Sequence, residues 1–252
     1  MLSKKELKYY SSLRLKKFRD EENKFIAEGK KIVEEGLSSK LKPEIIFCTK
    51  EFIEKEERFF DSINRNIRKE VLSEKDFQKI SDTVSPQGIA GVFAKPNDHS
   101  DVQVINENII VCLDNISDPG NLGTIIRNCD WFGIRSIILT INCADIYNSK
   151  TIRASMGSVF HLKFFNKIKF NQIKKLKEKE YQFICTDIRG EDIYSTSISQ
   201  KTLITFSNEA NGPSKEILNL ADKRITIPGK GKAESLNVAS ASAVILSYLA
   251  RE

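Results

Sequence analysis

The sequence predicts an α/β protein in two parts, a small α/β module followed by a larger domain built on a parallel sheet. Short apolar runs rich in β-branched residues alternate along the chain with segments whose apolar residues recur at helical spacing. The polar stretch Pro96 to Asp101 is the best candidate for a linker between the parts. The chain has 252 residues, of which 40% are hydrophobic, so it can form one large core or two modest ones.

The first part is expected to cover residues 1–96. Residues 1–37 are predicted to be helical, because Leu7, Tyr10 and Leu13 form one apolar stripe and Phe25, Ile26 and Ile32 belong to a second. Beyond them, strands are expected at 45–48, 71–72 and 89–94, and helices at 50–58 and 74–80.

The second part is expected to cover residues 106–252, after a linker at 97–105. Its predicted strands are 109–113, 136–139, 159–165, 182–186, 203–206 and 225–227, with helices between them and a last helix at 237–249. This alternation is typical of a parallel sheet with helices on both faces. Ligands bind such sheets at the carboxyl ends of the strands, where we therefore expect the functional site.

Basic and aromatic residues are concentrated near the N-terminus. The net charge is only +6, but Lys8, Arg14, Lys16, Lys17 and Arg19 are among seven basic residues in the first twenty, interleaved with aromatic rings. Cations and rings together suit the phosphates and bases of RNA. A solvated helix face explains the same pattern equally well.

Other features exclude several classes. No apolar run approaches the roughly 20 residues that cross a bilayer, and the N-terminus lacks the apolar core of a signal peptide, so a cytoplasmic location is expected. Five cysteines without a C-x-x-C pair indicate buried free thiols, with metal binding or a disulfide as the alternatives. His161, placed within an expected strand, suits a packed core or a dimer surface better than catalysis.

Four polar, glycine-containing segments follow predicted strand ends. They match neither a phosphate-binding P-loop nor a dinucleotide fingerprint, which disfavours a nicotinamide-dependent dehydrogenase. They offer no strong base, thiolate or metal site. Such a site suits a reaction that depends on alignment, for example methyl transfer from a sulfonium donor to a hydroxyl. The segments are Asn115 to Gly133, Arg153 to Ser158, Ser207 to Ser214 and Ile227 to Ser240.

Three of these segments carry a family resemblance. The pattern N-x-x-D-P-x-N-x-G-x-x-x-R-x-x-x-x-F-G from Asn115, N-E-x-x-G from Asn208 and I-P-x-x-G-x-x-E-S-L-N-V from Ile227 occur in the order of the SpoU branch of the SPOUT methyltransferases. These enzymes methylate ribose 2′-hydroxyls in rRNA or tRNA with S-adenosylmethionine. The first hundred residues also resemble the L30e-like substrate-binding domain of rRNA-type members.

The resemblance implies a fold, a cofactor and a set of site residues. The second part is expected to be a SPOUT domain with a deep trefoil knot, and the chain a homodimer through that domain that acts on RNA, with rRNA favoured over tRNA. No metal is implied. Residues matching catalytic positions are Asn121, Arg127, Glu209, Ser235 and Asn237. Those matching the S-adenosylmethionine pocket are Thr186, Ser207, Asn208, Gly212, Ile227, Pro228 and Leu236. RNA contacts are expected from Lys8, Arg14, Lys16, Lys17, Arg19 and Arg153.

The chain departs from the family at two notable positions. The family usually has glycine where this chain has Ser207, and a bulky residue where it has Gly229. These departures support an alternative, a non-catalytic RNA-binding protein on the same fold.

Single residues also have simpler explanations. Arg127 suits a surface ion pair, Ser235 or Asn237 a helix cap, and Asn208 a turn. Because a guanidinium stays protonated in proteins, we expect Arg127 to clamp a phosphate next to the target ribose, not to act as a base.

Overall fold

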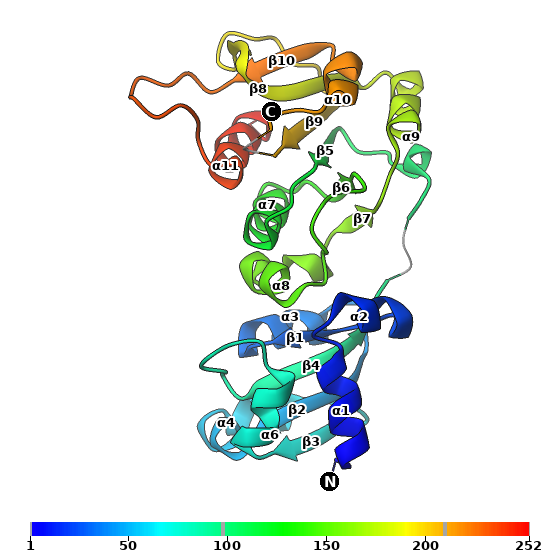
Figure 1. The fold of residues 1–252 in the computed structure, drawn as a ribbon, viewed down its shortest axis with the longest axis vertical. Coiled ribbons are helices and arrows are strands. Elements are labelled where there is room, and N and C mark those ends of the chain that lie inside the picture. The colour runs from blue at the N-terminus through cyan, green and yellow to red at the C-terminus, as the bar shows by residue number, and fades with distance from the viewer. Residues whose placement is uncertain (1, 97–98, 209–210, 252) are drawn as a thin grey trace. The chain divides into compact units, whose positions relative to one another are not determined.

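The computed structural model describes residues 2–96, 99–208 and 211–251, which form two compact units of mixed α/β structure (Figure 1). Unit 1 consists of Met1–Asn97 and Asp145–Phe160. Unit 2 consists of Asp98–Ala144 and His161–Glu252. The segment 145–160, expected in the second part from the sequence, thus packs in unit 1. None of the described helices has the length and apolar character needed to cross a membrane.

Unit 1 is built on a four-stranded mixed sheet with the order β1-β4-β2-β3. β4 is antiparallel to β1 and β2, whereas β2 and β3 are parallel. The strands are β1 (Lys24–Glu28), β2 (Pro43–Thr49), β3 (Arg68–Leu72) and β4 (Ile89–Ala94). The helices are α1 (Lys4–Ser12), α2 (Lys16–Glu22), α3 (Lys30–Ser38), α4 (Lys50–Lys55), α5 (Glu57–Ser62), α6 (Glu74–Ile80) and α8 (Ser149–Ser155), with a 3₁₀ turn at Ser158–Phe160.

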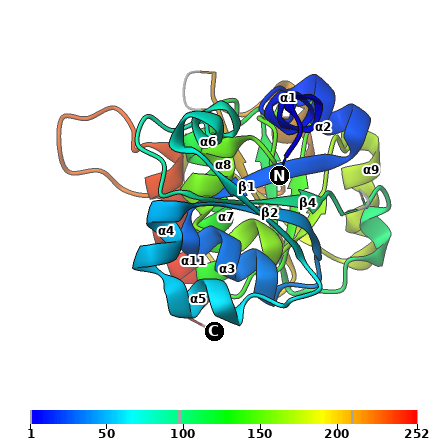
Figure 2. The same cartoon turned by 90° about the horizontal axis from the view of Figure 1, so that it is seen from below.

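Both faces of this sheet are covered. Successive strand residues point to opposite faces, so Phe47 packs in a core with residues of α1 and α6, whereas Ile46 packs in a core with residues of α3 and α4. Figure 2 shows α1 and α6 on one side of the sheet and α3, α4 and α5 on the other.

The prediction that residues 1–37 are helical is wrong at Phe25 and Ile26. Both lie in β1, where they pair with Phe93 and Val92 of β4 and are buried. The preceding helix ends at Asn23, whose left-handed conformation (φ 52°) turns the chain into the strand. Adjacent apolar residues fit helix and strand alike, and pairing with β4 selects the strand.

Unit 2 is built on a six-stranded sheet with the order β10-β8-β9-β5-β6-β7, and all of its pairs are parallel. The predicted parallel sheet is therefore confirmed. The strands are β5 (Ile109–Asp114), β6 (Ser136–Leu139), β7 (Lys163–Phe165), β8 (Gln182–Asp192), β9 (Thr202–Ser207) and β10 (Lys223–Thr226). The strand expected at 159–165 is shortened to β7, because Ser158–Phe160 forms the 3₁₀ turn of unit 1.

Helices cover both faces of this sheet as well. α7 and α11 pack against each other on one face, and α9 and α10 lie on the other (Figure 1). The helices are α7 (Pro119–Trp131), α9 (Phe170–Lys174), α10 (Lys215–Leu220) and α11 (Val238–Leu249), with 3₁₀ turns at Val102–Val104 and Lys175–Lys179.

Candidate functional site

The carboxyl ends of β5 and β9 bring two of the polar segments together. β5 and β9 are parallel neighbours, and Asp114 pairs with Ser207 at their ends. Asn208 donates from Nδ2 to the carbonyl of Asn115 (3.2 Å) and to Ser117 Oγ (3.3 Å). Asn208 therefore holds the loop after β9 against the loop after β5. An ordinary turn residue, the simpler explanation for Asn208, would not make these contacts.

The loop after β5 leads into α7, which carries two of the predicted catalytic residues. Asp118 caps the helix by accepting from the Asn121 backbone N (2.8 Å), and Pro119 occupies the first turn, where its missing N–H costs nothing. Arg127 is exposed and makes no ion pair with any residue the structure describes, so the surface ion pair is not formed there.

The N-terminus of α11 contacts α7. Asn237 caps α11 by accepting from the backbone N of Ala239 (3.0 Å) and of Ser240 (3.3 Å), as its structural alternative predicted. Its Nδ2 also donates to Asn121 Oδ1 at 3.1 Å, across 116 positions of the sequence. Asn128 of α7 makes a second link, from Nδ2 to the Ala239 carbonyl (3.0 Å) and Ser242 Oγ (2.9 Å).

The segment between β10 and α11 is an exposed loop. Residues 229–237 are exposed, including the large apolar side chain of Leu236 at 51%. Figure 1 shows this loop extending away from the sheet of unit 2. Ser235 lies on it and forms no hydrogen bond with another described residue, so it does not cap α11. A Cβ on Gly229 would meet nothing within 4 Å, so packing does not require that glycine.

Thr186 begins a bulge of β8. β10 pairs with Cys185 and then with Glu191, so the residues between them leave the ladder. The Thr186 hydroxyl donates to the Thr205 carbonyl of β9 (3.0 Å). The bulge ends at Gly190, which lies against β10. Only glycine fits at this position, because a Cβ there would lie 2.5 Å from the backbone of Ile225. Ile227 and Pro228 follow β10 and are half-buried.

Ser207 has an unusual environment at the end of β9. Its side chain is only 7% exposed, yet its hydroxyl has no hydrogen-bond partner among the described residues. The loop after it turns at Asn208, whose carbonyl accepts from Gly212 N (2.9 Å), with Gly212 at a positive φ of 62°. Glu209, expected to be catalytic, lies outside the described residues.

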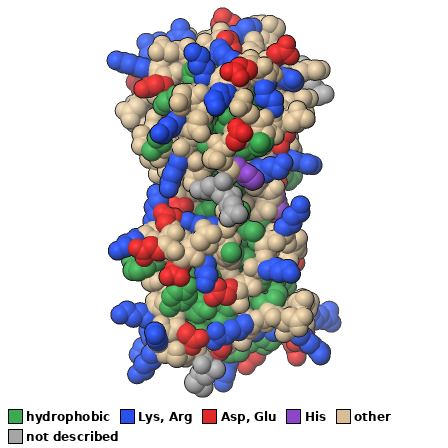
Figure 3. Space-filling view, turned by 90° about the vertical axis from the view of Figure 1, so that its right-hand side faces the viewer, with side chains coloured by type: hydrophobic (Ala, Val, Ile, Leu, Met, Phe, Trp, Pro, Cys, Tyr) green, Lys and Arg blue, Asp and Glu red, His purple; other side chains and the backbone are tan. Residues whose placement is uncertain are grey.

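Four of the five residues expected to bind RNA in the N-terminal part are exposed. Lys8, Lys16 and Lys17 are exposed, and Arg14 is exposed while its guanidinium approaches Asp82 at 3.4 Å. On the face shown in Figure 3, lysine and arginine side chains are mixed with acidic ones and do not gather in one area.

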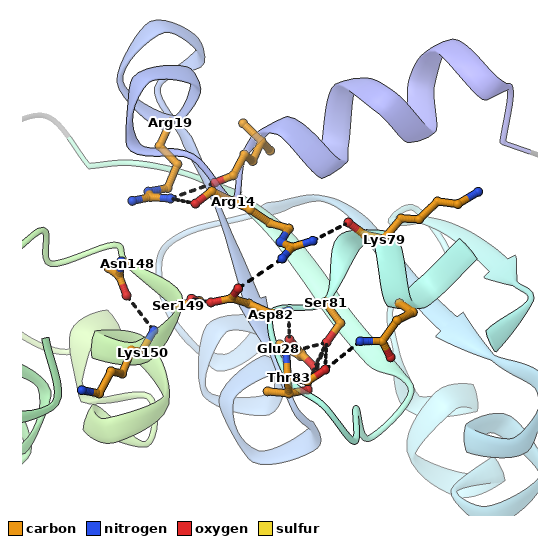
Figure 4. Close-up of polar contacts among 12 residues, drawn as sticks. Arg14, Arg19, Glu28, Lys79, Ser81, Asp82, Thr83, Asn148, Ser149 and Lys150 are labelled. Carbon is orange, nitrogen blue, oxygen red and sulfur yellow. Dashed lines mark hydrogen bonds and ion pairs between the residues drawn. The ribbon is translucent and has the colours of Figure 1, made fainter. Parts of the chain in front are cut away.

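The expectation that Arg19 contacts RNA is wrong. Its side chain is 3% exposed and pairs with Asp145 (Nη2 to Oδ2, 2.6 Å). It also donates to the carbonyls of Leu13 (3.0 Å) and Arg14 (2.6 Å), the latter two contacts being drawn in Figure 4. A guanidinium whose donors are used inside the unit is a structural group that is not available to a phosphate.

Arg153 does not lie at the sheet edge of unit 2. It belongs to α8 and lines a cavity of about 20 Å³ in unit 1 with Arg14, Asp82 and Ser149. Its Nη1 is buried without a partner among the described residues. This volume is enough to hold an ordered water beside these side chains.

The histidine and the cysteines are not reactive groups of this site. His161 is 39% exposed and contacts Asp130 (2.9 Å), which contradicts the packed-core alternative and leaves the dimer-surface alternative as a prediction. Four cysteines are buried and Cys143 is half-buried, as expected. Burial, chiefly, raises the pKa of the Cys48 thiol to about 12, as it does for Cys185. No described group of His, Cys, Asp and Glu residues has the geometry to hold a metal.

The sequence reasoning missed Asp114, Asn128 and Thr140. Asp114 is fully buried at the end of β5 and contacts Thr140, which follows β6. A charged residue closing an apolar strand was the available signal for Asp114. The roles of Asn128 and Thr140 depend on partners far away in the sequence and left no local signal.

Comparison with known proteins gives consistent matches over the chain. The SpoU rRNA Methylase family model matches residues 108–247, and the MRM3-like substrate binding domain model matches residues 4–91. The 23S rRNA (guanosine(2553)-2′-O)-methyltransferase RlmP of Bacillus subtilis is 32% identical, over 97% of this chain and 95% of that protein.

Two further relatives extend these matches. The human mitochondrial rRNA methyltransferase 3 is 26% identical, over 91% of this chain and 68% of its own length. A solved structure of an AdoMet-bound rRNA methyltransferase from Sinorhizobium meliloti, 30% identical, matches with a TM-score of 0.84 over 100% of this chain and 96% of that one. From the family model and the Bacillus relative together, we conclude that the chain belongs to the SpoU rRNA methylase family.

Proposed function

We propose that this chain transfers a methyl group from S-adenosylmethionine to the 2′-hydroxyl of a ribose in structured RNA, with rRNA favoured over tRNA. The Bacillus relative is named as a 23S rRNA 2′-O-methyltransferase, and the Sinorhizobium structure contains AdoMet. The observation that carries the proposal is the hydrogen bond from Asn237 to Asn121, because it joins the helix bearing Arg127 to the loop expected to hold the methyl donor.

The residues at this edge of the sheet fit such a cofactor. The buried hydroxyl of Ser207 has no partner among the described residues, and an unsatisfied buried polar group costs about 1–3 kcal/mol unless a ligand or water satisfies it. When bound, the cofactor supplies an electrophilic methyl group on a sulfonium. The residues that would hold it are Thr186, Ser207, Asn208, Gly212, Ile227, Pro228 and Leu236.

In this proposal the residues of α7 and of the loop before α11 orient the RNA. Arg127 clamps a phosphate next to the target ribose with its bidentate fork, for which its guanidinium is suited, since it is exposed and has no ion pair among the described residues. Asn121, Ser235 and Asn237 hold the 2′-hydroxyl in line with the methyl carbon, and Glu209 completes this set. Alignment then supplies much of the acceleration, because no described residue here is a strong base.

The proposal assigns a role to each part of the chain. Residues 1–96 bind RNA through Lys8, Arg14, Lys16 and Lys17, residues 97–105 connect, and residues 106–252 carry the knotted methyltransferase domain and its homodimer contact. The match of residues 4–91 to a substrate binding domain supports the first assignment. The cytoplasmic location stays a prediction.

Calorimetry and methyl transfer test this function together. We expect S-adenosylmethionine to bind the full chain, and labelled methyl groups to appear at ribose 2′-hydroxyls of ribosomal RNA from cells that lack the gene. Comparing 2′-O-methyl sites in rRNA and tRNA with and without the gene identifies the target. No heat with millimolar cofactor would exclude the enzyme and favour the non-catalytic RNA-binding alternative.

A further inference from the structure

Asp114 connects three loops at the proposed cofactor edge of unit 2. It ends β5, is fully buried and pairs with Ser207 of β9. Its Oδ1 accepts from Asn115 Nδ2 (3.0 Å) and from the Thr140 hydroxyl (3.4 Å). Its Oδ2 accepts from the backbone N of Ser214 (3.0 Å). The loops after β5, β6 and β9 therefore meet at one carboxylate.

The backbone of Asp114 strengthens this junction. Its carbonyl accepts from Asn208 N at 3.1 Å, so the side chain and main chain of Asp114 hold both ends of the loop from 208 to 214. Asn208 and Gly212, two of the proposed cofactor residues, lie on that loop. A substitution at Asp114 therefore removes the bond to Ser214 at one end of this loop and keeps the backbone bond at the other.

The charge of Asp114 is not balanced locally. Every hydrogen bond that its carboxylate accepts comes from a neutral group, and no lysine, arginine or histidine of the described chain lies within ion-pair distance. The nearby buried carboxylate of Asp187 differs, because Arg224 approaches it at 3.6 Å and Arg189 at 4.0 Å. Neutral donors stabilise a buried carboxylate without bringing a positive charge to it.

The strand that carries Thr186 lies beside β9, whose Ser207 pairs with Asp114. Burial is the main reason that the pKa of Cys185 on β8 is raised, and the charges of Asp187 and then Asp114 raise it further. Cys185 directly precedes Thr186, another proposed cofactor residue. In a buried environment the field of a unit charge is screened less than in water.

We propose that Asp114 is a positioning and specificity-determining residue whose uncompensated carboxylate favours the cationic sulfonium donor over its neutral thioether product. The inference rests on the proposed function, since it concerns the same cofactor site. The hydrogen bonds of Asp114 shape the loop from 208 to 214 in the same way for donor and product. The charge of Asp114 distinguishes the cationic donor from the neutral product. The chain would thereby retain the methyl donor more strongly than the spent cofactor.

Binding of the two ligands to the full-length chain tests this inference. Titration calorimetry would compare S-adenosylmethionine with S-adenosylhomocysteine for the unaltered chain and for Asp114→Asn. We expect Asp114→Asn to weaken binding of the sulfonium about tenfold and that of the thioether by no more than about twofold. Asp114→Ser, which removes the same charge with a smaller side chain, is measured in parallel so that the result does not depend on how the asparagine packs.

Thr140→Val is the matched control. It removes one donor to Asp114 and also a partner of the Asn115 backbone N (3.2 Å), but it keeps the charge. We expect it to change the two affinities by the same factor, so the ratio of affinities separates charge from loop shape.

Two outcomes would overturn the inference. Equal losses of both ligands in the Asp114 variants would leave Asp114 a purely structural residue, with the proposed function intact. Failure of the unaltered chain to bind either ligand would remove the proposed function and this inference together.

Discussion

The side-chain amide of Asn237 shows how one residue joins two motifs. Its oxygen caps α11 and its nitrogen donates to Asn121, so one side chain starts a helix and connects it to α7. An asparagine can do both because it carries an acceptor and two donors. Helix capping and a role in the site are therefore compatible at this position.

Asn237→Asp separates these two tasks. The carboxylate still caps α11, so we expect the midpoint of thermal unfolding to change little, whereas the donor to Asn121 is lost and methyl transfer falls. Asn237→Ala loses both and should also reduce stability by about 1 kcal/mol. Circular dichroism and a methylation assay measure the two effects, and full activity in Asn237→Asp would contradict a role for the link.

Ser207→Ala tests whether the unpartnered hydroxyl belongs to the ligand site. Removing a buried hydroxyl that lacks a protein partner should leave the free chain as stable as before, or up to about 1 kcal/mol more stable. We expect S-adenosylmethionine to bind several-fold more weakly in calorimetry. A destabilised free chain with unchanged affinity would mean that the hydroxyl is satisfied within the protein.

Arg127→Lys distinguishes a phosphate clamp from a base. A lysine keeps the charge but loses the bidentate fork, so we expect weaker RNA binding with turnover largely retained at saturating RNA. Steady-state kinetics give KM and kcat separately. Collapse of kcat at saturating RNA would show that the clamp alone is insufficient.

At the scale of elements, the segment 145–160 is integrated into unit 1 by charge and by aromatic packing. Asp145 pairs with Arg19 of α2, and Tyr147 packs on Phe25 of β1 with ring centroids 4.7 Å apart. The ring of Phe160 packs near those of Phe25 and Phe93, with ring centroids 5.8 Å and 5.0 Å apart, respectively. The segment is thus part of the core of a unit whose other residues all come from the first hundred positions.

Asp145→Ala should destabilise unit 1 strongly. It leaves Arg19 buried without its counter-charge, which typically costs about 3–5 kcal/mol. The double variant Arg19→Met with Asp145→Leu removes both charges and should recover most of that loss. Chemical denaturation measures both, and a loss below about 1 kcal/mol in Asp145→Ala would show that the pair is unimportant.

At the scale of the whole molecule, the fold could largely be predicted from the sequence, and the site only in part. The parallel sheet and most element boundaries follow from local apolar patterns and caps, as for α6 and β4, whose bounds agree with the expected ones. The positions of Arg19 and Arg153 could not be predicted, because the burial of a charged residue depends on partners that are distant in sequence.

Replacing Lys8, Lys16 and Lys17 together by alanine tests RNA binding at this scale. We expect weaker RNA binding and a salt dependence whose logarithmic slope falls by about 2 units, with cofactor binding unchanged. The exposed Lys169, Lys174 and Lys175 of unit 2 provide a matched triple control. If both triple variants weaken RNA binding equally, Lys8, Lys16 and Lys17 contribute only through the net charge of the protein and do not form a specific RNA-binding surface. Truncation at residue 95 is a poorer test, because it would uncover the apolar side of segment 145–160.

By itself the sequence determined the alternation of strands and helices, the order of the three motifs and a candidate cap of α11 at Asn237, because each depends on residues within a few positions of one another. Only the tertiary structure decided that Asn237 reaches Asn121, that Arg19 is buried against Asp145 and that Asp114 joins three loops. These contacts span up to 126 positions and arise from strand order and helix packing, which no local pattern encodes.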